Sequence, residues 1–160
     1  RFQILVEGEL GYLRGSSELH KEVIEIKEED LTDPEQAKDF VEKTGVNFLA
    51  VAVGNIHGMI EGSSVPRLDI SRIKEIKEAV KIPLVLHGGS GIPNEEISAA
   101  IEAGISIIHI NTELRLAWRQ GLEKALKDNP EEIVPYKILP TAVEAMKKVV
   151  EARLKLFNKI

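Results

Sequence analysis

One stretch, from Ile82 to Pro93, constrains the fold more than any other part of the sequence. It opens with an apolar run that ends at Leu86, and then changes abruptly to His87 and a Gly-Gly-Ser-Gly turn over residues 88–91. An apolar run of this length between turn residues predicts a parallel strand that is buried on both faces. The glycines let backbone N–H groups approach a ligand, and the next helix points its N-terminus at the same place. The stretch therefore predicts a site for an anion such as phosphate, and the alternative is a histidine packed beside an ordinary turn.

The alternation of an apolar strand with an amphipathic helix occurs about four times along the chain. Strands are expected at residues 3–9, 47–53, 82–86 and 105–110. Helices are expected over residues 34–43, 68–80, 94–103 and 112–127, with a last helix from Pro140. A capping box at residues 32–35 predicts the start of the first helix. Residues 12–30 form a long polar stretch, which is often a functional loop, and residues 59–67 read as a linker.

Strands that are apolar on both faces require helices on both sides of a parallel sheet. In a (β/α)8 TIM barrel, functional residues lie at the C-terminal ends of the strands. The polar residues of interest all occur at such ends: Glu7, Glu9, His57, His87, His109, Asn111 and Thr112. The sequence thus predicts an α/β fold in which this chain supplies four of the eight units of a TIM barrel. A doubly wound open sheet is the alternative, but a Gly-rich turn after the first strand is missing.

Two histidines occupy similar places in consecutive units, and they suggest a metal site. His57 and His87 each follow an apolar strand, and Glu9 ends the strand before them. Two imidazoles and one carboxylate are a plausible ligand set for zinc with an open position for substrate. A single histidine of this kind is more often structural, so the hypothesis depends on the pair. Asn111 and Thr112 precede a helix and could form the second half of the anion site.

Four motifs in order make the chain resemble the C-terminal half of the zinc-dependent class II fructose-bisphosphate aldolases. They are Val6-Glu7-Gly8-Glu9-Leu10-Gly11, Gly54-Asn55-Ile56-His57-Gly58, Leu86-His87-Gly88-Gly89-Ser90-Gly91 and Asn111-Thr112-Glu113-Leu114. The resemblance covers nearly the whole chain. It implies a single domain over residues 1–160 that forms the last four βα units of a TIM barrel.

The resemblance also implies roles for individual residues. His57, His87 and Glu9 would bind Zn²⁺, and Glu7 would lie behind them. The substrate and its phosphate would contact Gly58, Gly88, Gly89, Ser90, His109, Asn111 and Thr112. Zinc would polarise the substrate ketone and stabilise the enediolate. The loop that starts at Gly11 would cover the site.

The chain departs from the family pattern in two respects. The catalytic Asp and the third zinc-binding His belong to the first half of the barrel, so no catalytic residue is assigned in this chain. The family usually has Lys-x-Asn before the last phosphate segment, where this chain has Ile107 and His109. His109 either binds substrate in place of Asn, marks a changed specificity, or fills the barrel interior.

The expected reaction is the reversible cleavage of fructose 1,6-bisphosphate to dihydroxyacetone phosphate and glyceraldehyde 3-phosphate, a lyase step of glycolysis and gluconeogenesis. We expect the isolated chain to be inactive. One alternative is a tagatose-bisphosphate or other ketose-bisphosphate aldolase. Another is a half-barrel that binds phosphosugar or metal without turnover, because the catalytic Asp lies outside this chain.

Composition limits the partners and the compartment. The net charge of −5 over 160 residues argues against a nucleic acid partner. Apolar runs fall short of the ~20 residues of a membrane span. The absence of cysteine and of a leader pattern fits a cytoplasmic protein. The chain begins inside an apparent strand without Met, so we expect sequence upstream. A half-barrel leaves two open strand edges, which predicts a homo-oligomer or pairing with the missing N-terminal half.

Overall fold

The computed structural model describes residues 4–62 and 67–159. Residues 63–66, which belong to the predicted linker, lie outside the described part, as does the start of the first predicted strand. The chain divides into two compact units, residues 1–110 and residues 111–160. The prediction of a single domain stays a prediction, and the two units are described separately.

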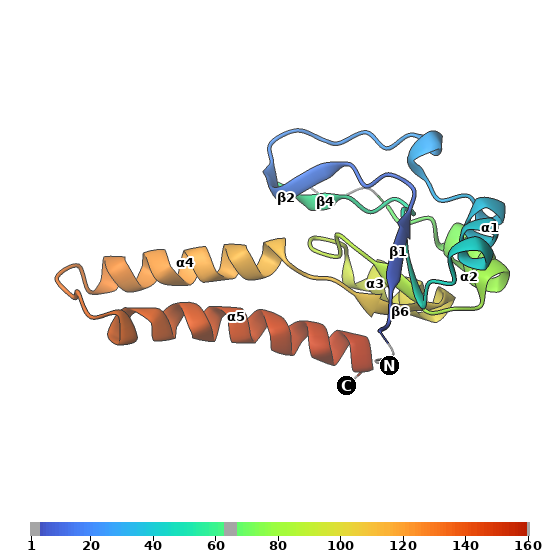
Figure 1. The fold of residues 1–160 in the computed structure, drawn as a ribbon. Helices are drawn as coiled ribbons and strands as arrows, with labels where there is room; N and C mark the ends of the chain where they lie inside the picture. The colour runs from blue at the N-terminus through green and yellow to red at the C-terminus, as the bar shows by residue number, and fades with distance from the viewer. Residues whose placement is uncertain (1–3, 63–66, 160) are drawn as a thin grey trace. The chain divides into compact units, whose positions relative to one another are not determined.

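The first unit contains a four-stranded parallel sheet (Figure 1). Its strands are β1 (Glu7–Leu10), β3 (Phe48–Val51), β5 (Leu84–Leu86) and β6 (Ile105–Ile108), in that spatial order. The order follows the chain, so each new strand adds to the same edge. A doubly wound sheet would instead reverse direction at a switch point. Stepwise addition of parallel strands is the arrangement of a TIM barrel, and the four strands described here form an open part of one.

Helices α1 (Pro34–Thr44), α2 (Ile70–Val80) and α3 (Asn94–Ala103) connect these strands. β5 is buried as predicted, because Leu84, Val85 and Leu86 are all inaccessible to solvent. The residues of β1 are instead exposed or half-buried, so the prediction of a strand buried on both faces is wrong for β1. Ile73 and Ile76 of α2 are equally buried. The core therefore lies between the sheet and its connecting helices, and it fixes the ends of the strands.

The start of α1 differs from the predicted capping box. Asp33, and not Thr32, caps the helix by accepting a hydrogen bond from the backbone N–H of Gln36. The buried Thr32 hydroxyl instead donates to the carbonyl of Leu10 and accepts from the N–H of Ala52. Leu10 is the last residue of β1, and Ala52 directly follows β3. Thr32 therefore connects the C-terminal ends of these two neighbouring strands. Tertiary hydrogen bonds have replaced the local cap.

The long polar stretch over residues 12–30 is more regular than predicted. It contains β2 (Gly15–His20) and the short 3₁₀ helix η1 (Glu28–Asp30). β2 pairs in parallel with β4 (His57–Ile60), and the two strands form a second small sheet (Figure 1). Strand β4 lies partly in the region predicted as a linker. The sequence does not predict β2, because all of its residues except the last are exposed and it therefore lacks an apolar pattern.

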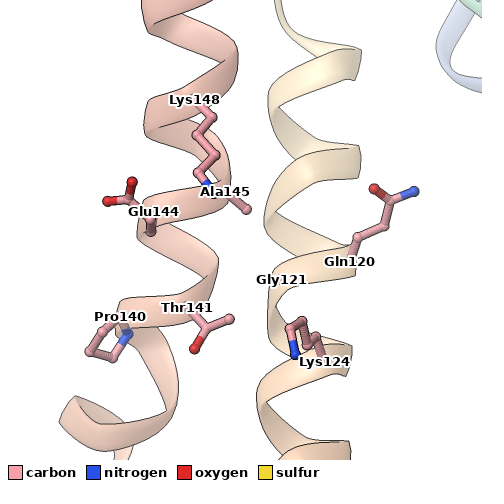
Figure 2. A pocket seen from close by; sticks show the side chains of 8 residues that line it. All are labelled: Gln120, Gly121, Lys124, Pro140, Thr141, Glu144, Ala145 and Lys148. Carbon is pink, nitrogen blue, oxygen red and sulfur yellow. The ribbon is translucent and has the colours of Figure 1, made fainter.

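The second unit is a pair of antiparallel helices, α4 (Thr112–Asp128) and α5 (Pro135–Asn158) (Figure 1). Helix α5 starts five residues before the predicted position, and Pro140 lies inside it. Arg153 of α5 forms an ion pair with Glu113 of α4, in which Nε lies 3.0 Å from the carboxylate. An open groove of about 570 Å³ lies between the helices around Gly121 and Thr141 (Figure 2). None of the helices in the described ranges is both long and apolar enough to cross a membrane.

Candidate functional site

His87 lies at the centre of the candidate site, directly after β5. Its Nε2 atom is 2.8 Å from Oε1 of Glu7, and its Nδ1 atom is 2.8 Å from Oε2 of Glu9. Both carboxylates come from β1, where alternate residues point to the same face. Strand β3 lies between β1 and β5, and Ala50 is the register partner of Glu9 on it. Phe48 is the register partner of Glu7, and both carboxylates reach His87 across β3.

Two further imidazoles lie close to His87. The ring of His109 stacks on that of His87 with a centroid distance of 4.7 Å and an interplanar angle of 18°. The ring of His57 lies farther away, at 6.5 Å. His109 directly follows β6, whereas His57 is the first residue of β4. The structure therefore brings the three predicted histidines of the strand ends together.

The donor atoms of this cluster suit a divalent transition metal such as Zn²⁺, which prefers imidazole nitrogen and carboxylate oxygen. One oxygen of Glu7 and one nitrogen each of His87 and His109 lie within 4.8 Å of one another. The sequence-predicted set of His57, His87 and Glu9 shares His87 with this group. That predicted set stays a prediction, and the convergent group adds Glu7 and His109 to the candidates.

The predicted anion loop follows His87 and is tightly packed. Gly88 has a φ of +62°, and a Cβ atom there would overlap the carbonyl oxygen of Ile56. Gly58 has a φ of +96° and would carry its Cβ into the backbone of Ser16. The adjacent Ser90 is buried. Only glycine fits at positions 88 and 58, since both the backbone angle and the space exclude a side chain.

The remaining predicted residues occupy different surroundings. A Cβ atom on Gly89 would lie 2.7 Å from the side chain of Ile108, so β6 packs against the loop. Asn111 and Thr112 open the second unit, where Thr112 is the first residue of α4. Their predicted contact with a phosphate stays a prediction.

Sequence reasoning missed two residues that support the site. The buried Asn55 donates a hydrogen bond to the backbone carbonyl of His87. His20 places Nε2 at 2.8 Å from the carbonyl oxygen of His57 and 3.0 Å from that of Ser16. Asn55 lies two residues before His57, and an amide side chain that follows an apolar run is the signal that the sequence offers.

The base of the segment between β1 and α1 is held by an ion pair. Arg14 donates to both carboxylate oxygens of Asp30, at 2.5 and 2.8 Å. The guanidinium of Arg14, with help from the backbone N–H of Lys27, holds the pKa of Asp30 below its ordinary value. The backbone N–H of Tyr12 also donates to the carbonyl of Asp30. These contacts join residues 12 and 14, at the start of the segment that contains β2, to Asp30 at its end.

Parallel strands added in chain order, with His87 and His109 directly after two of them, are typical of an α/β-barrel protein. The two carboxylates that contact His87 lie within β1, and not at its C-terminal end as predicted. Comparison with known proteins identifies the group. The chain belongs to the class II fructose-bisphosphate aldolase family, whose family model matches residues 1–160. The resemblance seen in the sequence is thus confirmed.

Solved structures agree with this assignment. The YdjI aldolase from Escherichia coli K12 is 36% identical, with a TM-score of 0.69, over 96% of this chain and 48% of that one. A candidate fructose-1,6-bisphosphate aldolase from Coccidioides immitis is 30% identical, with a TM-score of 0.75, over 97% of this chain and 52% of its own.

The fructose-bisphosphate aldolase from Campylobacter jejuni, at 22% identity, shares the fold with a TM-score of 0.74 over 98% of this chain and 52% of its own. The chain therefore spans about half the length of the structures it matches. The predicted fold, half of an α/β barrel, is confirmed.

Proposed function

We propose that this chain is the C-terminal half of a zinc-dependent aldolase that reversibly cleaves fructose 1,6-bisphosphate to dihydroxyacetone phosphate and glyceraldehyde 3-phosphate. The observation that carries the proposal is the cluster around His87 at the strand ends, in a chain of the class II aldolase family. A tagatose bisphosphate or another ketose bisphosphate is the second candidate substrate.

His87 is the central zinc ligand in this proposal, with His57 and Glu9 as the partners that the resemblance implies. When bound, the metal supplies a Lewis acid that polarises the substrate ketone. The chain's own residues bind and orient the substrate. Gly58 and Gly88 pack closely against the backbone of Ser16 and Ile56. The resemblance implies that their peptide N–H groups contact the phosphate, and peptide N–H groups are good partners for phosphate oxygens. The proposed substrate contacts are Gly58, Gly88, Gly89, Ser90, His109, Asn111 and Thr112.

The proton transfer that accompanies bond cleavage needs an acid or base. The family places this role on an Asp in the first half of the barrel, so we assign no catalytic residue here. The isolated chain is consequently expected to bind but not to turn over its substrate.

A cleavage assay tests the proposal. The chain is assayed with fructose 1,6-bisphosphate and zinc, alone and together with a polypeptide that carries the first four βα units of a class II aldolase. We expect dihydroxyacetone phosphate to form only with both parts present, and EDTA to abolish its formation. Cleavage that resists EDTA would overturn the proposal. Parallel assays with tagatose 1,6-bisphosphate separate the two candidate substrates.

A non-catalytic role as a phosphosugar-binding or metal-binding half-barrel is the second proposal. The packed glycines after His87 favour it, because they do not depend on the catalytic Asp that the family carries in the first half of the barrel. Calorimetry of the isolated chain with dihydroxyacetone phosphate tests this role. Absence of heat at millimolar ligand would reject it.

The chain is also proposed to self-associate or to pair with the N-terminal half of the barrel. β1 and β6 are the edges of the described four-stranded sheet, and unpaired strand edges favour association. Ile4 and Leu5, which precede β1, expose most of their surface. Sedimentation of a single monomeric species would contradict this proposal. A cytoplasmic location is proposed with it, on the basis of the cysteine-free sequence.

A further inference from the structure

The imidazole of His20 lies in a narrow space between β2 and β4 that two glycines keep open. Its Nε2 atom is 2.8 Å from the carbonyl oxygen of His57 and 3.0 Å from that of Ser16. A Cβ atom on Gly58 would lie 2.5 Å from this nitrogen, and one on Gly15 would lie 3.0 Å from it. Only 13% of the His20 side chain is exposed. The backbones of both strands therefore enclose the ring and fix its position.

The pairing of β2 with β4 is irregular at this place. Gly15 is the register partner of His57, and Leu19 is that of Met59, so β2 advances by four residues where β4 advances by two. His20 is the last residue of β2, and its ring reaches back across the irregular part to the first residue of β4. The side chain thus joins the two strands where their backbone pairing is interrupted.

Nε2 of His20 is the donor in these contacts. Carbonyl oxygens only accept hydrogen bonds, and Nε2 carries a proton both in the imidazolium and in one of the two neutral tautomers. The bond to His57 therefore does not depend on the charge of the ring. The backbone nitrogen of Ser16 is 3.5 Å from Nε2, which is beyond the usual range of a hydrogen bond, so it does not compete.

The carbonyl of His57 and the N–H of Gly58 belong to the same peptide group. This group is planar and trans, so its oxygen and its N–H point in opposite directions. The N–H of His57 donates to the carbonyl of Arg14 at 2.8 Å, and Arg14 is itself held by Asp30. Residues 14 and 20 therefore hold both backbone polar groups of His57, and the N–H of Gly58 points away from His20.

We propose that His20 is a positioning residue for the substrate phosphate, because its hydrogen bond to the His57 carbonyl fixes the peptide that ends in the N–H of Gly58. The inference rests on the proposed function, in which Gly58 contacts the phosphate, and it adds a residue to which the resemblance gives no role. A hydrogen bond on the carbonyl also polarises the peptide, which makes its N–H a stronger donor. A donor that is fixed in advance loses less conformational entropy when the anion binds.

Calorimetry of the whole 160-residue chain with dihydroxyacetone phosphate and with inorganic phosphate tests the inference. The side-chain nitrogen of Gln is as many bonds from Cα as Nε2 of His, whereas that of Asn is one bond closer. H20N should therefore weaken both ligands by ~3–10-fold, the value of one hydrogen bond, and H20Q should restore them to within about twofold of wild type. V23A is the matched control, because Val23 lies exposed in the same segment, and its affinities should equal those of wild type.

The variants separate positioning from a role in packing alone. Equal affinities of H20N and wild type would overturn the inference, and so would an H20Q variant that binds as weakly as H20N. If the wild-type chain binds neither ligand, the phosphate contacts of the proposed function fail. Spectra of the ligand-free chain then decide whether His20 holds this peptide.

The amide resonance of Gly58 responds to the hydrogen bond on the adjoining carbonyl. It should shift in H20N and stay near its wild-type position in H20Q and V23A, and an unshifted resonance in H20N would overturn the inference. In the wild-type chain, long-range ¹H–¹⁵N correlations of the ring should place a proton on Nε2 of His20. A proton on Nδ1 alone would overturn the assignment without any substitution.

Discussion

The side-chain amide of Asn55 donates a 2.9 Å hydrogen bond to the backbone carbonyl of His87. The same amide donates to the carbonyl of Val51, and its oxygen accepts from the N–H of Val53 at 2.8 Å. Asn55 is buried, so these bonds replace those that water would otherwise supply. The segment after β3 is thereby tied to the end of β5. Asn55 is a positioning residue for His87.

Removal of this amide should destabilise the chain. In N55A the buried carbonyls of Val51 and His87 lose a donor, and an unsatisfied buried group costs about 1–3 kcal/mol. We expect the free energy of unfolding in urea to fall by at least that amount. N55D should be impaired as well, because a carboxylate can accept from Val53 but cannot donate to the two carbonyls. N158A removes an exposed amide and should change stability by less than about 0.5 kcal/mol; an equal loss in both alanine variants would contradict the role of Asn55.

Gly88→Ala tests how tightly the anion loop is packed. Gly88 and Gly45 have nearly the same backbone conformation, with φ of +62° and +67°. A Cβ atom at position 45 meets nothing within 4 Å, whereas one at position 88 overlaps the backbone of Ile56. G45A should therefore cost only the left-handed conformation, about 1–2 kcal/mol. G88A should cost clearly more, because backbone atoms must also move.

Urea unfolding of both variants measures the difference, which isolates the steric contribution. The metal affinity of G88A should fall as well, since the displaced backbone carries His87. Equal stabilities of G45A and G88A would show that the loop can relax and that the close approach is not structurally required.

The accuracy of the sequence-based predictions follows from the range of the interactions involved. The strand at β5 and the histidines at strand ends are encoded locally, by an apolar run and an abrupt change in polarity. The roles of Glu7 and Glu9 are not, because they depend on which nitrogen of His87 each carboxylate meets across β3. β2 was missed since its exposed residues have no periodic pattern, and only its pairing with β4 defines it. Thr32 was assigned to a helix cap because its bonds to Leu10 and Ala52 span 22 and 20 residues.

The ion pair between Arg14 and Asp30 should make the free energy of unfolding depend on pH in the acid range. Arg14 and then the backbone N–H of Lys27 lower the native pKa of Asp30 beneath its ordinary value of 3.8. The contribution of Asp30 is thus fully present above the unfolded pKa and is lost as the pH falls through the lower native pKa. D30N should be less stable at neutral pH, and its stability should fall less steeply between about pH 5 and about pH 3.

Urea midpoints measured across this pH range check the prediction for Asp30. D39N serves as the comparison, because it breaks the exposed pair of Asp39 with Lys43, which is worth no more than about 0.5 kcal/mol. A D30N profile parallel to that of wild type would exclude Asp30 as a source of the acid sensitivity.

Gly121→Ala sets helix propensity against packing in the second unit. Alanine stabilises a helix interior over glycine by about 1 kcal/mol, so propensity alone predicts a more stable α4. A Cβ atom on Gly121 would, however, lie 2.7 Å from the Cα atom of Ala142 and 3.0 Å from the carbonyl oxygen of Thr141 on α5. Both are backbone atoms that cannot rotate away, and overpacking typically costs about 1–3 kcal/mol. The cost of overpacking should exceed the gain in helix propensity, so G121A should lower the thermal midpoint of the helical circular dichroism signal.

Q120A, at the exposed neighbouring position, is the control for this prediction and should leave the thermal midpoint within the error of the measurement. A stabilised G121A would mean that α4 and α5 separate easily, and that their close approach at Gly121 contributes little to the helix pair.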